Sequence, residues 1–252
     1  MALLEIDNVT VRFGGLTAVN EVSLTVGAGE VCAVIGPNGA GKTTLFNAVS
    51  GNAAIGSGRI LFQGEPIHGL LPHQISAKGV RRTFQNGGLF GDLTALENVL
   101  VGLHARVESG ILGVLLASPS ARRIETEATA RARALLDLME IGHVADQPAA
   151  QLSGGQQRIV EIVRALATEP PLLLLDEPAV GLAPHMREQL VSIIRRLAGQ
   201  GIGILLIEHA IELVMSVADR VVVLNYGKKV ADAPPAAVRA DKNVLEAYLG
   251  HV

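Results

Sequence analysis

Apolar and polar residues alternate along two segments near the start of the chain, residues 4–9 and 19–26. A repeat of two residues is typical of a β-strand with one buried face, and the glycines at 14–15 and 27–29 would separate such strands. Residues 58–65 have the pattern of one arm of a hairpin. We therefore expect an antiparallel sheet in the N-terminal segment.

Four further segments are apolar throughout and fit strands that are buried on both faces. They lie at residues 31–35, 172–175, 202–207 and 221–224. Helical patterns separate the last three, at about 185–198 and 210–218. Strands that alternate with helices predict a mostly parallel sheet covered by helices, which is an α/β fold.

Between about residues 76 and 169 the pattern is mostly helical. Residues 121–140 place their apolar side chains on one face and Arg and Glu on the other. That charged face is either a solvated surface or a contact with a partner. We expect one domain over residues 1–252, with a β-containing core from 1–87 and 161–252 and a helical subdomain from 88–160.

The chain has 252 residues, 49% of them hydrophobic, and a formal net charge of -3. Neither this charge nor the 3% content of aromatic residues favours a nucleic acid as the partner. No apolar run reaches the ~18–20 residues that span a bilayer, so we expect any membrane role to come through partner subunits. The N-terminus lacks a secretory pattern, and the one cysteine, Cys32, fits a small buried strand residue.

The first of the fully apolar runs leads into a glycine-rich phosphate-binding motif. The motif reads Gly36-Pro37-Asn38-Gly39-Ala40-Gly41-Lys42-Thr43 and is followed by a helical pattern. Glycines let backbone N–H groups surround a phosphate at the start of a helix. In such a loop Lys42 would bridge the β- and γ-phosphates of a nucleotide, and the Thr43 hydroxyl would bind Mg²⁺.

Two carboxylates follow the apolar run at 172–175. In an open α/β sheet, ligands bind at the carboxyl ends of the strands. Asp176 can hold Mg²⁺ through water, and Glu177 can accept a proton from an attacking water. Taken alone this pair fits a polar strand end, but the phosphate-binding motif favours the catalytic interpretation.

A third motif reads Leu152-Ser153-Gly154-Gly155-Gln156. Ser153 fits the N-cap of a helix that runs from about 156 to 168. A capped helix start does not need two glycines, and glycines at this position expose N–H groups that a phosphate can approach.

These three motifs resemble the ATPase domain of ABC transporters, in which a phosphate loop precedes an acidic strand end as it does here, and the resemblance covers essentially the whole chain. It implies a P-loop NTPase fold of the ABC type that binds and hydrolyses ATP with Mg²⁺. It further implies that Ser153, Gly154, Gly155 and Gln156 of one subunit cover the ATP bound by a second ATPase subunit, identical or related. Two membrane permeases and an extracytoplasmic solute-binding protein would complete the transporter, with this chain at the cytoplasmic face of the membrane.

The resemblance assigns roles to three single residues. Phe13 matches the aromatic residue that stacks on adenine, with a core Phe as the alternative; Gln85 matches the glutamine that contacts Mg²⁺ and the attacking water. His209 matches the histidine that contacts the γ-phosphate. We also expect Val19 and Thr44 to contribute to the nucleotide site. The family often has an acidic residue where this chain has Ala183.

Finer features resemble the ATPases of branched-chain amino acid importers. They include residues 79–85 and 89–99, the insertion near 105–123, and Tyr248-Leu249-Gly250. Importers of urea and short amides share much of this pattern, and an ATPase of a lipid or lipopolysaccharide exporter is a further alternative. Residues 111–117 fit either helical core packing or a docking contact. Lys42, Glu177 and His209 together disfavour a subunit that does not hydrolyse ATP.

Overall fold

The computed structural model describes residues 2–83, 88–104, 119–241 and 244. The chain forms two compact units. Unit 1 comprises residues 1–85, 171–180 and 184–252, and unit 2 comprises residues 86–170 and 181–183. Residues 161–170 thus group with the helical unit and not with the core, where the sequence pattern placed them. One helix, α6 (Gly154–Leu166), runs without a break through position 160.

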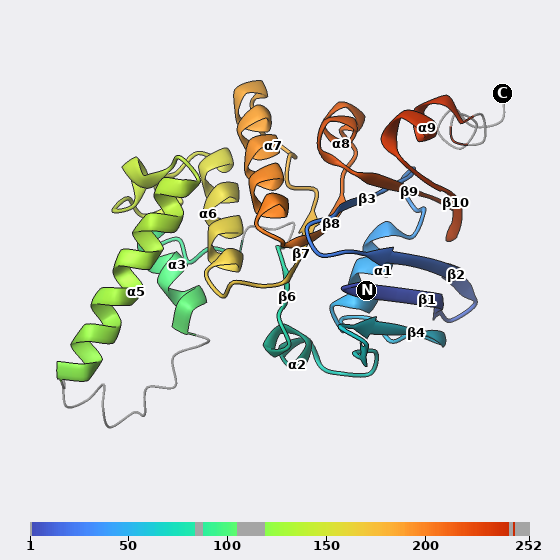
Figure 1. Ribbon diagram of the computed structural model, residues 1–252, viewed down its shortest axis with the longest axis horizontal. Coiled ribbons are helices and arrows are strands. Elements are labelled where there is room, and N and C mark those ends of the chain that lie inside the picture. The colour runs from blue at the N-terminus through green and yellow to red at the C-terminus, as the bar shows by residue number, and fades with distance from the viewer. Residues whose placement is uncertain (1, 84–87, 105–118, 242–243, 245–252) are drawn as a thin grey trace. The chain divides into compact units, whose positions relative to one another are not determined.

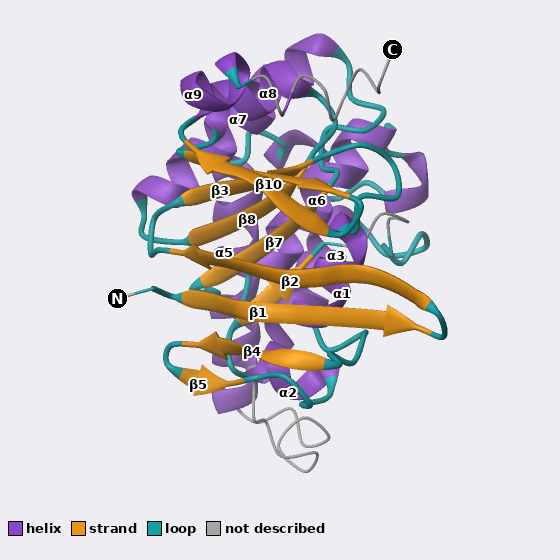
Figure 2. Cartoon of the chain, turned by 90° about the vertical axis from the view of Figure 1, so that its right-hand side faces the viewer, coloured by secondary structure: helices purple, strands orange, loops and turns teal. Residues whose placement is uncertain are grey.

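Unit 1 contains an antiparallel sheet of four strands in the order β2-β1-β4-β5 (Figure 2). Its strands are β1 (Leu4–Phe13), β2 (Leu16–Val26), β4 (Ser57–Phe62) and β5 (Glu65–Pro66). Ile6 pairs with Leu24 on one side and Ile60 on the other, and all three side chains are buried. The alternating pattern therefore reflects a sheet with one face on the core, as the sequence predicted.

A six-stranded sheet in the order β10-β9-β3-β8-β7-β6 completes the β-structure of unit 1. Its strands are β3 (Val31–Ile35), β6 (Val80–Arg82), β7 (Leu172–Asp176), β8 (Gly203–Ile207), β9 (Arg220–Asn225) and β10 (Lys228–Ala233). All pairings are parallel except that of β9 with β10. Every residue of β3, β7 and β8 is buried, which explains why these strands are apolar except for Asp176 at the end of β7.

Two strands of this sheet differ from the sequence prediction. Residues 80–82 were expected in the helical region, but they form β6 and pair with β7 through Val80 and Leu172. A segment of three residues is too short to show a period, so its pairing with a distant strand decides its structure. The antiparallel β10 was not predicted either.

Helices and strands share the core of unit 1. The core cluster joins residues of both sheets with Leu45, Phe46 and Val49 of α1 (Lys42–Val49). Helix α7 (Pro184–Gly199) packs against β3 and β8. The shorter helices of this unit are α2 (Pro72–Ala77), α8 (Ile211–Val217) and α9 (Pro235–Ala240). Cys32 of β3 is fully buried, as expected of a small strand residue.

Unit 2 is helical in its described part (Figure 1). It contains α3 (Ala95–His104), α5 (Pro119–Leu138), α6 and two short 3-10 turns at Gly142–Val144 and Ala149–Gln151. Helix α3 packs against both α5 and α6. Asn98 of α3 is completely buried, and its amide donates to the carbonyls of Phe90, Leu93 and Thr94, which fixes the loop before the helix. Among the described residues, no helix combines the length and apolar character needed to cross a bilayer.

The burial of Cys32 leads to a first prediction. Removal from water raises the pKa of its thiol from the ordinary 9.0 to about 12. The folded chain should therefore react with a thiol-specific disulfide reagent more than about 100-fold more slowly at mildly alkaline pH than the chain in concentrated guanidinium chloride. The chain has one cysteine, so the reaction reports on this position alone.

The raised pKa of the Cys32 thiol also makes the free energy of unfolding depend on pH. Above the ordinary thiol pKa the unfolded chain loses this proton while the folded chain keeps it, so stability should fall as pH rises through that value. Equal reaction rates of the folded and unfolded chains would show that β3 is not packed as described.

Candidate nucleotide-binding and catalytic site

The loop between β3 and α1, residues 36–41, is packed tightly against two neighbouring strands. A Cβ atom added to Gly36 would lie 2.1 Å from the backbone oxygen of Leu224 in β9, and one added to Gly41 would lie 2.4 Å from that of Ala18 in β2. Both positions also have positive φ, 149° and 101°. Only glycine is compatible with these two positions, so the path of the loop is set by its close contact with β2 and β9.

The start of α1 leaves backbone donors available. Gly41 is the N-cap and offers no side-chain hydrogen bond to the first turn. The first N–H groups of a helix have no partner within the helix, and the helix dipole favours negative charge at this end. The loop and the first turn therefore provide donors suited to phosphate oxygens.

Lys42 follows directly and is only 5% exposed. Its Nζ donates to the backbone oxygens of Gly36 at 2.7 Å and Pro37 at 2.9 Å. Burial lowers the pKa of Lys42, while the charges of Glu177 and Asp176 oppose this shift. The ammonium group is thus held at the loop by weak neutral acceptors, which phosphate oxygens can replace with stronger, charged ones.

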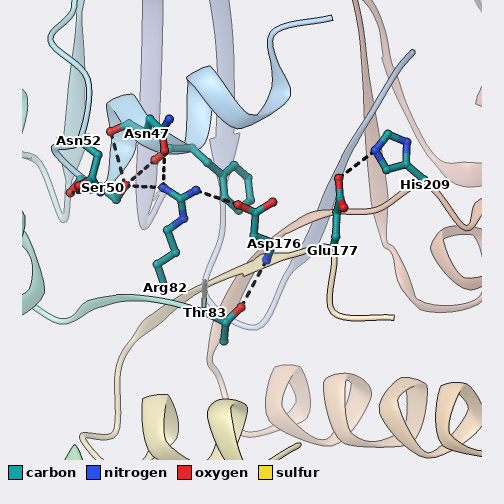
Figure 3. Close-up of polar contacts among 9 residues, drawn as sticks. Asn47, Ser50, Asn52, Arg82, Thr83, Asp176, Glu177 and His209 are labelled. Atoms are coloured by element: carbon teal, nitrogen blue, oxygen red, sulfur yellow. Dashed lines mark hydrogen bonds and ion pairs between the residues drawn. The ribbon is translucent and has the colours of Figure 1, made fainter. Parts of the chain in front are cut away.

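Adjacent parallel strands bring Glu177 and His209 together. Asp176, the last residue of β7, is paired with Ile207 of β8, and the N–H of Glu177 donates to the Ile207 oxygen at 2.9 Å. His209 Nε2 lies 2.9 Å from Glu177 Oε1 (Figure 3). An ionised carboxylate only accepts, so Nε2 carries the proton in this pair. Glu177 has a φ of 48°, an uncommon value for a residue with a side chain and one often found at functional sites.

A buried ion pair holds Asp176. Arg82 Nη2 donates to Asp176 Oδ2 at 2.8 Å, and the two side chains are only 9% and 1% exposed. Arg82 Nη1 donates to Asn47 Oδ1 at 2.7 Å and to Ser50 Oγ at 2.9 Å, both at the end of α1 (Figure 3). Arg82 therefore connects β6, β7 and α1 through side-chain contacts.

One pocket of about 460 Å³ collects most of the predicted site residues of unit 1. It is lined by Phe13, residues 38–44, Glu177 and His209, and also by residues 16–18 and 226–227, most of which the sequence did not single out. Gly36, Pro37 and Asp176 are not part of the lining. Val19 was expected at the nucleotide, but its side chain is fully buried in the core, because alternate residues of β2 face opposite sides.

The remaining predicted residues lie elsewhere in the chain. Gln85 falls outside the described residues. Ser153, in unit 2, caps α6: its Oγ accepts from the N–H of Gln156 at 3.3 Å, and Gln156 Oε1 accepts from the N–H of Ser153 at 3.0 Å. A Cβ on Gly154 would meet no atom within 4 Å. Packing within the chain thus gives no reason for a glycine at that position, whereas close approach by a ligand does.

The pocket fits a nucleotide in size and donor chemistry. Its volume lies within the range of roughly 300–1,000 Å³ typical of small-molecule sites. Among the described residues, no group of three or more His, Cys, Asp or Glu side chains is placed to hold a metal ion. The predicted ligands, the Thr43 hydroxyl and the Asp176 carboxylate, suit Mg²⁺, which commonly takes its other ligands from phosphates and water.

A sequence model described as ABC transporter matches residues 19–180, more than half of the chain. The chain belongs to the ABC transporter family. A second model, described as branched-chain amino acid ATP-binding cassette transporter, matches residues 228–252. The family resemblance expected from the three motifs is therefore confirmed.

Individual ABC proteins are similar over almost the full chain. The high-affinity branched-chain amino acid transport ATP-binding protein BraF of Pseudomonas aeruginosa is 45% identical and covers 98% of both chains. LivG of Escherichia coli, which has the same description, is 42% identical with the same coverage. A nucleotide-free ATP-binding cassette from an ABC transporter has a TM-score of 0.86 and 33% identity, with both chains fully covered. These similarities confirm the predicted α/β fold.

Beyond the motifs, the structure of this ABC chain reveals a buried carboxylate that sequence reasoning missed. Glu208 is 1% exposed; its Oε1 accepts from the N–H of Ala179 at 2.8 Å, and its Oε2 accepts from those of His209 and Ala210 at 2.8 and 3.0 Å. It therefore joins the turn after Glu177 to the turn that carries His209. The only sequence signal for this role of Glu208 was its position at the end of an apolar run, next to a candidate catalytic His.

The buried Arg82–Asp176 pair yields a second prediction. Arg82→Met should lower the free energy of unfolding by about 3–5 kcal/mol, because it leaves the Asp176 charge without its cation in a buried position. The double variant Arg82→Met/Asp176→Asn should regain much of this loss. Urea unfolding followed by circular dichroism measures both.

The exposed ion pair between Arg59 and Asp7 provides the matched control. Its side chains are 58% and 32% exposed, so Arg59→Met should change stability by about 1 kcal/mol or less. If Arg82→Met proved as mild as Arg59→Met, Arg82 would not be the buried partner of Asp176.

Proposed function

We propose that the chain binds and hydrolyses ATP as one subunit of an importer of branched-chain amino acids. The observation that carries this proposal is that Glu177, 2.9 Å from His209, lines the same pocket as Lys42 and the loop glycines. A site that only binds a nucleotide needs the loop but not a carboxylate beside it. A carboxylate held by a histidine is suited to accept a proton from water.

Nucleotide binding would use groups that the loop holds ready. The backbone N–H groups of Gly39 and residues 41–43 would donate to phosphate oxygens, and Lys42 Nζ would exchange the oxygens of Gly36 and Pro37 for phosphate. Phe13, 55% exposed at the pocket, would stack on the base. Its exposure favours this role over that of a core residue.

Hydrolysis would rely on Glu177 as the general base for the attacking water. The hydrogen bond from His209 Nε2 fixes the direction of the carboxylate, and Glu208 fixes the backbone on both sides of this pair. Thr43 and, through water, Asp176 would hold Mg²⁺, which supplies positive charge to the phosphate oxygens. Gln85 is proposed as a further ligand of this ion.

The capped helix start at Ser153 would complete the site of a second subunit. Ser153 and Gly154 are exposed, and Gly154 has free space above it. A relative with 26% identity and a TM-score of 0.77, covering 92% of this chain and 98% of that chain, is described as dimeric and bound to ADP and Pi. This supports the proposal that two such chains, identical or related, enclose the nucleotides between them.

The names of the relatives support the choice of solute. BraF and LivG are described as branched-chain amino acid transport proteins, and a model with that description also matches residues 228–252. We therefore propose that the chain works on the cytoplasmic side of two membrane permeases that receive the solute from an extracytoplasmic binding protein. The descriptions of BraF and LivG name neither urea or short amides nor lipids.

Replacement of the proposed base is the direct test. Glu177→Gln should bind ATP normally but lower the rate of hydrolysis by about 10²–10⁴-fold, because an amide cannot take up the proton of the attacking water. Steady-state phosphate release and calorimetric ATP binding measure the two effects. Glu212→Gln, on an exposed carboxylate of α8, should behave like the wild type.

The same variant tests the solute. Cells that carry Glu177→Gln as their only copy should lose uptake of labelled leucine and keep uptake of urea. Phosphate release near the wild-type rate would rule out Glu177 as the base, and a selective loss of urea uptake would rule out the proposed solute.

Two inactive variants should restore each other if the site is shared between subunits. Lys42→Ala removes the phosphate contact but keeps the Ser153 segment, and Ser153→Arg obstructs the segment but keeps the loop. Each alone should be inactive, whereas a mixture at high concentration forms pairs with one intact site. We expect about half of the wild-type rate per mixed pair if the two sites act independently. Full activity of Ser153→Arg alone would contradict the shared site.

A further inference from the structure

The turn between β9 and β10 carries a tyrosine in a backbone conformation that favours smaller residues. Asn225 pairs with Lys228, so Tyr226 and Gly227 form a two-residue turn, with φ of 45° and 76°. Such turns favour Asn or Asp before Gly, because a bulky side chain is strained at positive φ. Tyr226 is also 86% exposed and so gains little from packing. A strained and exposed aromatic residue indicates a functional constraint.

Backbone hydrogen bonds hold this turn against the phosphate loop and against β2, and both of these segments line the nucleotide pocket. The N–H of Gly227 donates to the Ala40 oxygen of the phosphate loop at 3.0 Å, and the N–H of Asn20 in β2 donates to the Gly227 oxygen at 2.8 Å. A Cβ on Gly227 would come within 2.9 Å of the Ala18 oxygen. The backbone of Tyr226 is therefore held in a fixed place beside the loop and β2.

Tyr226 lines the same pocket as Phe13. The whole chain has only five Phe, two Tyr and no Trp, yet two of these seven aromatic residues are exposed at this pocket, on separate elements. Tyr226 brings a flat apolar ring and a hydroxyl but no charge. That chemistry suits a base and its ribose better than phosphates.

We propose that Tyr226 is a second aromatic contact for the nucleoside part of the bound nucleotide, in addition to Phe13. The inference rests on the proposed function, because it places a residue in the site assigned there to ATP. Tyr226 would then contribute to nucleotide affinity, and the anchored turn would hold its ring in place before the ligand arrives.

Fluorine NMR on the full-length chain tests the contact without relying on hydrolysis. Tyrosine is present only at positions 226 and 248, so 3-fluorotyrosine labelling gives two signals, and Tyr226→Phe identifies one of them. Titration with Mg²⁺ and ADP should shift the Tyr226 signal in a saturable way. The midpoint should match the dissociation constant from calorimetry.

Affinities of three variants complete the test. Tyr226→Ala should weaken ADP binding by about five- to fiftyfold, the range of base–aromatic stacking, and should leave inorganic triphosphate binding unchanged. Tyr226→Phe should stay close to the wild type because it keeps the ring. Phe90→Ala is the control, since Phe90 is a 53% exposed aromatic residue that does not line the pocket.

The outcomes separate the inference from the proposed function. A stationary Tyr226 signal and wild-type ADP affinity of Tyr226→Ala would overturn the inference while ADP still binds. An equal loss of ADP and triphosphate affinity in Tyr226→Ala would overturn it as well, because Tyr226 would then act on the phosphates. Failure of the wild-type chain to bind either ligand would instead contradict the proposed function.

Discussion

The phosphate loop depends on how closely two strands approach its backbone. The Leu224 oxygen of β9 and the Ala18 oxygen of β2 leave no room for a side chain at Gly36 and Gly41. Because the loop is confined in this way, the N–H groups at the start of α1 are not free to turn toward other acceptors. A rigid cradle of this kind loses little conformational entropy when a phosphate binds.

Charges around this loop are balanced by partners within unit 1. Lys42 is satisfied by loop carbonyls, Asp176 is held by Arg82, and Glu208 accepts three backbone N–H groups. Each of these three buried charges thus has compensation within the chain, which the low dielectric of the interior demands. Glu177 and His209 are more exposed, 19% and 39% for their side chains, and remain accessible to water and a nucleotide.

Sequence patterns predicted the architecture well because burial is periodic. The alternating β1 and β2 and the apolar β3, β7 and β8 all appeared in the sequence, as did the motifs at Gly36–Thr43 and Asp176–Glu177. Strands β6 and β10 did not, since a short edge strand depends on its neighbours. Val19 was expected at the nucleotide but is buried in the core, because the strand register decides on which side of the sheet each side chain lies. Arg82, Glu208 and Tyr226 gain their roles from contacts between distant segments.

Arg82 and Glu208 also show what a motif leaves out. The motifs supply the groups that we propose contact the nucleotide, while these two buried residues determine where those groups point. Glu208 joins the ends of β7 and β8, and Arg82 joins β6, β7 and the end of α1. The geometry of the proposed catalytic residues therefore depends on the parallel sheet as a whole, and a change at Arg82 or Glu208 should alter it from outside the pocket.

A crystal structure of the Glu177→Gln chain with Mg²⁺ and ATP would show whether the loop at residues 36–41 binds the phosphates. We expect phosphate oxygens within hydrogen-bond distance of the N–H groups of Gly39 and residues 41–43, with Lys42 Nζ on phosphate instead of on the Gly36 and Pro37 oxygens. ATP bound away from this loop, or a Lys42 that kept both carbonyl contacts with the phosphates elsewhere, would contradict this expectation.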